Sequence, residues 1–145
     1  MTKIFNKSLA YRFIVLSLIT LTTYACNKSS DKTMNEIQNL KKLKTEPKFV
    51  SNGLYTGLEN KSNEKSLSDL LDNIIDDFSK GAENNFTDEQ YQNLIKKSLM
   101  KFDSFNLDTE DREYICGYFE KIMDAIGLES SGGALNEWLY GFKIE

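Results

Sequence analysis

The sequence predicts an all-α protein, a small bundle of three to four helices preceded by a signal peptide, a flexible tether and an extended arm. Three segments carry apolar residues at spacings of three and four, the repeat that places them on one face of a helix. Helix-capping residues precede these segments, and two of the three are followed by glycine. The predicted domains are a signal peptide at 1–25, a tether at 26–48 and a helical domain at 49–145.

The first 25 residues have the three parts of a secretion signal. Lys3, Lys7 and Arg12 form a positive leading region, and an apolar stretch follows at 13–21. Mostly small residues follow at 22–25. The apolar stretch is too short for a lasting membrane span, which needs roughly 20 residues.

The segment Thr23-Tyr24-Ala25-Cys26 resembles the bacterial lipobox, in which the cysteine is acylated and becomes the first mature residue. It departs from the usual pattern at Thr23, where Leu is common, and at Tyr24, where a smaller residue is common. The alternative is an ordinary secretory peptide with a nearby cysteine. Asn27 is not the Asp of an inner-membrane retention signal. We therefore expect a cell-envelope lipoprotein, held in the outer membrane of a Gram-negative cell and facing the periplasm or the exterior.

The predicted tether is polar and contains the only proline, Pro47. Ile37, Leu40 and Leu43 form too thin an apolar face to predict more than a short helix. A flexible chain of about 20 residues reaches on the order of 25 Å.

The helical domain opens with an extended arm at 49–58, in which Asn52-Gly53 is a turn dipeptide. An isolated hairpin here is marginal in water, so we expect the arm to lie on the helices. The residues predicted to be buried in this way are Phe49, Leu54, Tyr55 and Leu58.

The first predicted helix begins at a Ser66 cap and ends at Gly81. The second begins at Thr87, with Gln90 in capping-box spacing and Phe86 placed to pack against Tyr91. The apolar stripe of the first helix is Leu67, Leu70, Leu71, Ile74, Ile75 and Phe78.

The third predicted helix starts at Asp108 or Thr109 and stops at Gly127. A short fourth helix is expected at 134–140. It would bury Leu135, Trp138 and Leu139.

Composition excludes several chemistries. Removal of residues 1–25 leaves 15 basic and 22 acidic residues, a net charge of −7 that argues against nucleic acid and anionic lipid. The chain has no histidine, which excludes Ser-His and Cys-His dyads and histidine-containing zinc sites. If Cys26 carries lipid, Cys116 has no disulfide partner. We predict no cofactor and no metal site.

The final part of the chain resembles a family of small bacterial proteins, a domain of unknown function that is often lipid-anchored. The resemblance covers about the last 60 residues, mainly 86–142, and is carried by 107–115, by Gly127-Leu128-Glu129-Ser130-Ser131-Gly132-Gly133 and by Trp138-Leu139-Tyr140-Gly141-Phe142. It implies an all-α fold and no activity, since the family has no assigned site to transfer.

Two sets of residues are candidates for binding a partner. Asp69, Asp72 and Asp76 share one face of the first helix, where they would meet a basic partner or simply form a solvated face. Trp138 and Tyr140 belong to an aromatic segment that would either anchor an interface or close the core. Helical spacing points Tyr140 away from Trp138, so we expect Tyr140 to be exposed.

These observations favour a non-enzymatic, lipid-anchored module that binds a protein partner, such as an immunity-type inhibitor. A hydrolase acting on envelope carbohydrate through carboxylates alone is the alternative, and a structural envelope component is a third possibility. The carboxylates available for such an enzyme are Asp76, Asp77, Asp108, Glu110 and Asp111.

Overall fold

The computed structural model of the protein describes residues 30–142. The chain divides into two compact units, Met1–Met34 and Asn35–Glu145. In the first unit, the described residues 30–34 are helical. The predicted signal peptide and Cys26 lie outside the described residues. No helix among residues 30–142 combines the length and apolar character that a membrane crossing requires.

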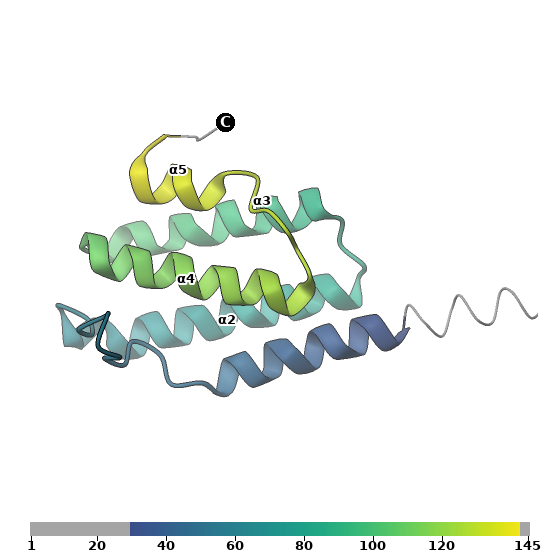
Figure 1. Ribbon diagram of the computed structural model, residues 1–145, viewed down its shortest axis with the longest axis horizontal. Coiled ribbons are helices and arrows are strands. Elements are labelled where there is room, and N and C mark those ends of the chain that lie inside the picture. Colours follow the sequence, from purple (N-terminus) through teal and green to yellow (C-terminus); the bar gives the residue numbers. More distant parts are fainter. Residues whose placement is uncertain (1–29, 143–145) are drawn as a thin grey trace, which may run out of the picture. The chain divides into compact units, whose positions relative to one another are not determined.

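The second unit is a bundle of helices, and its described residues contain no strand, which confirms the predicted all-α fold. Residues 35–45 form the helix that begins the bundle. In Figure 1, α2, α3 and α4 lie side by side, and α5 packs across α3 and α4. The elements after the first helix are η1 (Lys61–Asn63), α2 (Glu64–Glu83), α3 (Asp88–Leu99), η2 (Met100–Phe105), α4 (Thr109–Ile126) and α5 (Ala134–Tyr140), where η marks a 3-10 helix.

The core is made by the apolar faces that the helical spacing predicted. Its aromatic centre includes Phe102, whose ring meets Phe119 edge-on at 6.3 Å between centroids. The largest fully buried side chains are Phe78, Phe102, Phe119, Leu40, Leu67, Leu71, Ile74, Ile75, Ile95, Leu99, Ile115 and Ile122.

The capping signals of α3 and α4 were predicted correctly. Thr87 Oγ1 accepts a hydrogen bond from Gln90 N, and the Gln90 side chain accepts one from Thr87 N, which completes the capping box. Asp108 caps α4 by accepting a hydrogen bond from Asp111 N at 2.7 Å. Gly127 ends α4 in the left-handed conformation.

The predicted ends of α2 were wrong by several residues. Ser66 lies inside α2, which begins at Glu64. The 3-10 helix η1 precedes α2, and the Asn60 side chain caps η1 by accepting a hydrogen bond from Ser62 N. Gly81 also lies inside α2, and its role is close packing: a Cβ there would come within 2.8 Å of the Tyr91 ring. The left-handed residue after the helix is Asn85.

The prediction of a flexible tether at 26–48 was also wrong in its second half, because residues 35–45 are helical and pack on the bundle. Leu40 and Leu43 are buried in the core. The Tyr118 hydroxyl of α4 donates a hydrogen bond to the Leu43 carbonyl at 2.7 Å. The apolar face of the helix at 35–45 is thin, but it is sufficient to hold the helix on the bundle because polar contacts add to the attachment.

Lys48 provides the main polar contact of this attachment. Its side chain is only 4% exposed, and its Nζ lies 2.7 Å from an Asp72 carboxylate oxygen of α2. The same ammonium donates to the carbonyls of Lys44 and Glu46, which end the helix at 35–45, and lies 5.6 Å from the Tyr118 ring centroid. One cation therefore joins the first helix to α2 and α4.

The arm that follows Lys48 folds largely as predicted. Phe49, Tyr55 and Leu58 are buried. Leu54 was predicted to be buried but is 98% exposed, because it lies in a turn where Asn52 N donates to the Tyr55 carbonyl and Asn52 Oδ1 accepts from Tyr55 N.

We predict that Lys48→Met lowers the free energy of unfolding by about 2–3 kcal/mol, because Asp72 and two carbonyls lose a buried charged donor. Urea titration followed by circular dichroism measures the change. The control is Lys65→Met, which removes the exposed Lys65–Asp69 pair and should change the free energy by about 1 kcal/mol or less. Equal losses in the two variants would contradict a special role for Lys48.

Candidate functional site

The three aspartates predicted as a partner-binding face of α2 all have lysine partners within the protein. The pairs are Lys65 with Asp69, Lys48 with Asp72 and Lys44 with Asp76. The hydrogen bond to Asp76 raises the pKa of Lys44, which keeps the ammonium group of Lys44 charged. Two of the three pairs hold the helix at 35–45 against α2, so Asp72 and Asp76 have a structural role.

Trp138 lies in the cluster that attaches α5. Its indole Nε1 donates a hydrogen bond to Asp103 at 2.8 Å, and its ring packs edge-on against Phe102. The Arg112 guanidinium lies 4.5 Å from the ring centroid and donates to the Trp138 carbonyl at 3.0 Å. Leu135 is buried as predicted, but Trp138 and Leu139 are only partly buried and pack at the edge of the core.

Tyr140 is on the surface, as expected, with 53% of its area exposed. Its ring lies 6.0 Å from that of Phe142, which is also exposed. This pair remains available for contact with a partner.

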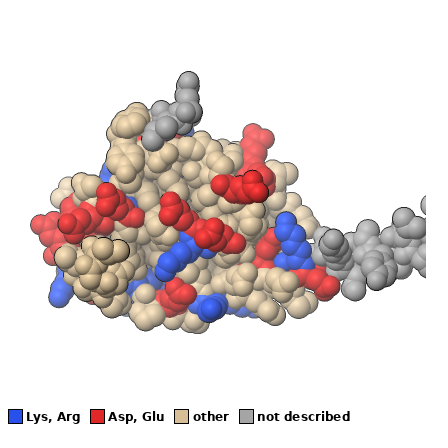
Figure 2. Space-filling view, viewed as in Figure 1, with Lys and Arg blue, Asp and Glu red and all other residues tan. Residues whose placement is uncertain are grey.

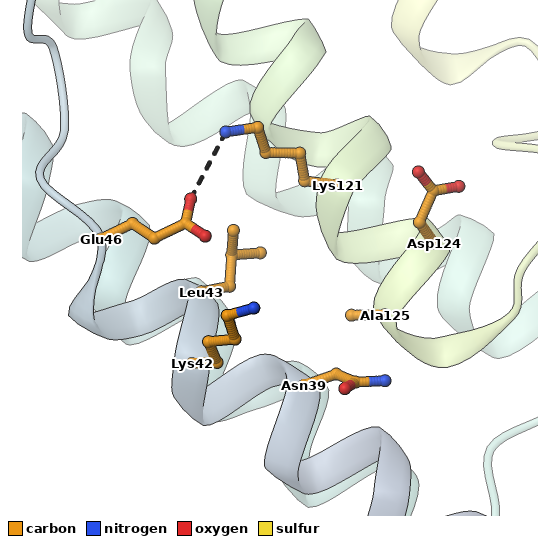
Figure 3. A pocket seen from close by; sticks show the side chains of 7 residues that line it. All are labelled: Asn39, Lys42, Leu43, Glu46, Lys121, Asp124 and Ala125. Carbon is orange, nitrogen blue, oxygen red and sulfur yellow. Dashed lines mark hydrogen bonds and ion pairs between the residues drawn. The ribbon is translucent and has the colours of Figure 1, made fainter.

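The surface on one side of α4 forms a groove against the helix at 35–45 (Figure 3). The groove has a volume of about 340 Å³, and Leu43 and Ala125 contribute its apolar part. Lys121 and Glu46 form an ion pair of 3.4 Å that bridges the two helices at one end. The other lining residues are Asn39, Lys42 and Asp124.

A second depression lies on the other side of α4, between this helix, the loop at 127–133 and the start of α5. We call it the α4–α5 hollow. Its volume is about 450 Å³, and it shares Asp124 with the groove. Its lining residues are Glu120, Met123, Asp124, Leu128, Glu129, Ser130, Ser131, Leu135 and Asn136.

The two depressions flank one charged ridge on α4, formed by Glu120, Lys121 and Asp124. In Figure 2, acidic groups lie over the second half of α4 with basic groups beside them. We call the ridge and its two depressions the α4 face. Neither these residues nor the surfaces on either side of them were predicted from the sequence. A surface of this kind can bind a partner through shape and charge.

The carboxylates considered for a hydrolase each contact another group in the protein. Asp76 pairs with Lys44, and Asp77 pairs with Lys80 and Lys101. Asp108 caps α4, and Glu110 accepts a hydrogen bond from Thr56 at 3.4 Å.

Asp111 is the most buried of these carboxylates. It accepts a hydrogen bond of 2.6 Å from the Tyr55 hydroxyl and so attaches the arm to α4. Burial raises the pKa of Asp111, and the nearby Asp108 charge adds to the rise, although hydrogen bonds from the Tyr55 hydroxyl and the Glu59 backbone oppose it.

Cys116 is buried in α4, and burial raises the pKa of its thiol to about 12. A thiol of this kind is protonated at neutral pH and has little nucleophilic character. Among residues 30–142, no group of three or more Cys, Asp or Glu side chains is placed to hold a metal ion.

Comparison with known proteins identifies relatives of this fold. The family model of DUF4844, a domain of unknown function, matches residues 29–143. The resemblance noted in the sequence covered mainly residues 86–142. The family match begins much earlier and includes the helix at 35–45. The chain is also similar to the crystal structure of a DUF3571 family protein from Acinetobacter baumannii, with 34% identity, a TM-score of 0.70, and coverage of 77% of this chain and 93% of the other. A search of curated proteins gave no match.

The raised pKa of Asp111 predicts a pH dependence of stability. The folded state holds this proton more tightly than the unfolded state, so the stabilisation is complete below pH 3.8 and is lost as pH rises through the higher folded pKa. Asp111→Asn removes this titration, so the wild type should lose stability relative to the variant as pH rises above 3.8. Urea titrations at pH 3.5, 5 and 7 measure the difference, with exposed Glu113→Gln as control. Parallel curves for wild type and Asp111→Asn would show that Asp111 has an ordinary pKa.

Proposed function

Since the chain belongs to the DUF4844 family, a domain of unknown function, we propose that it is a non-catalytic partner-binding module held in the cell envelope by a lipid on Cys26. Such a module acts by occupying its partner, as an immunity-type inhibitor does. The surface that carries this proposal is the α4 face, with depressions of about 340 and 450 Å³ on its two sides.

The distribution of charge supports the choice of this surface. The aspartates at positions 69, 72 and 76 of α2 are paired with lysines, so they are poorly placed to attract a partner. On the α4 face, Glu120 and Asp124 are exposed and form no ion pair among the described residues. Exposed carboxylates of this kind steer a basic partner and fix its orientation.

The helical bundle also suits a role in binding. Its first helix is attached by ion pairs and by the Tyr118 hydrogen bond, and this attachment forms one wall of the groove. A surface formed by packed helices changes little on binding, which reduces the entropic cost of association.

We predict that Cys26→Ser releases the protein from the membrane, because the variant cannot be acylated. Fractionation with detergent partitioning measures this. The matched control is Cys116→Ser, which should remain in the membrane fraction because this thiol is buried in α4. Membrane retention of Cys26→Ser would exclude the lipid anchor.

We predict that a photo-crosslinking amino acid at position 39 of the full-length protein captures a defined partner in living cells, because Asn39 is exposed, lines the groove and leaves the carboxylates of the α4 face in place. The control places the same amino acid at position 73, an exposed site on α2. Capture at both positions alike, or at neither, would count against the α4 face as the binding surface.

A further inference from the structure

The α4–α5 hollow has an acidic rim and a mainly polar lining, with a small apolar patch. Met123, Leu128 and Leu135 line it and belong to the buried core. The rim carries the three exposed carboxylates Glu120, Asp124 and Glu129. Within residues 30–142, none of the three forms an ion pair or accepts a side-chain hydrogen bond. The nearby Lys121 is directed to Glu46 on the opposite side of α4.

The loop that closes the hollow is held in place. Gly127 N donates to the Asp124 carbonyl and Leu128 N donates to the Met123 carbonyl, the two bonds of a Schellman motif, which brings Leu128 into the core. Gln92 of α3 donates to the Ser130 carbonyl at 3.1 Å. At Gly132, whose φ is +63°, a Cβ would come within 2.9 Å of the Gln92 side chain. The hollow is therefore preformed, and little ordering is needed to fill it.

A small apolar patch beside an acidic rim complements one class of side chain. Arginine and lysine carry a charged end on an apolar stem, which packs on hydrophobic surface while the charge stays at the edge. Carboxylates form their strongest hydrogen bonds with such cations, and arginine can engage them in a bidentate manner. The volume of about 450 Å³ lies within the ordinary range of ligand pockets.

We propose that the α4–α5 hollow receives an arginine side chain from a basic segment of the protein partner. The stem packs on Met123, Leu128 and Leu135, and the guanidinium meets the rim carboxylates. The inference rests on the proposed binding function and specifies the partner's chemistry at that same face.

The probe is N-acetyl-triarginine amide, added to the chain from residue 26 onward with Cys26→Ser and followed by methyl NMR. We expect saturable shifts of the Met123, Leu128 and Leu135 methyl signals that weaken with added salt. The neutral analogue with citrulline in place of arginine should leave these signals unchanged.

The double variant Asp124→Asn/Glu129→Gln should bind the peptide about tenfold more weakly, since two charge-assisted contacts are lost. The control Glu83→Gln/Glu89→Gln makes the same change in net charge at exposed sites on α2 and α3 and should bind like the wild type. Equal weakening in both double variants, or shifts spread over every acidic surface, would overturn the assignment.

The two proposals fail in different ways. A partner cross-linked at position 39, together with unchanged spectra on addition of the peptide, would overturn the arginine hollow and leave the binding function standing. Saturable binding of the peptide with no cross-linked partner would support the hollow and count against the binding function.

Discussion

The bundle depends on the buried ammonium group of Lys48. This group caps the carbonyl end of the helix at 35–45, pairs with Asp72 of α2 and lies beside the Tyr118 ring of α4. A charge removed from water is favourable only when several partners replace the solvent, and here a carboxylate and two carbonyls do so. The position of Lys48 therefore requires that the first helix, α2 and α4 stay together.

The α4 face follows from this arrangement. Leu43 and Asn39 form one wall of the groove because the helix at 35–45 is attached along α4. The opposite side of α4 is bounded by a loop that Gly127 turns back and that Gln92 anchors. The helix at 35–45 and the loop at 127–133 are attached independently on the two sides of α4. They thus create two depressions along α4, with its charged residues between them.

The same contacts determine which carboxylates remain available. Lys44 lies in the first helix and Lys48 directly follows it. Their ammonium groups pair with Asp76 and Asp72 of α2 and neutralise these carboxylates. The rim of the α4–α5 hollow has no comparable lysine within the described part of the chain. The net negative charge of the sequence is therefore unevenly distributed over the surface. Helix packing, rather than composition, determines which carboxylates remain free to attract a partner.

Much of the fold was predictable because it depends on short-range rules. The spacing of Leu67, Leu71 and Ile74 specifies a buried helical face. The hydrogen bonds of the Thr87–Gln90 capping box close within four residues, so its position could be predicted as well. Gly81 was misinterpreted because its significance is the approach of Tyr91, ten residues away and in another helix.

The sequence by itself determined the all-α class, the caps of α3 and α4, the absence of histidine chemistry and the net acidic charge. Only the tertiary structure decided that residues 35–45 belong to the bundle, that Asp72 and Asp76 are paired internally and that two depressions flank α4. Helix period and capping depend on neighbours within one or two turns, which the sequence displays directly. An ion pair such as Lys44–Asp76 joins residues 32 positions apart, and only the packing of the whole bundle determines which distant charges meet.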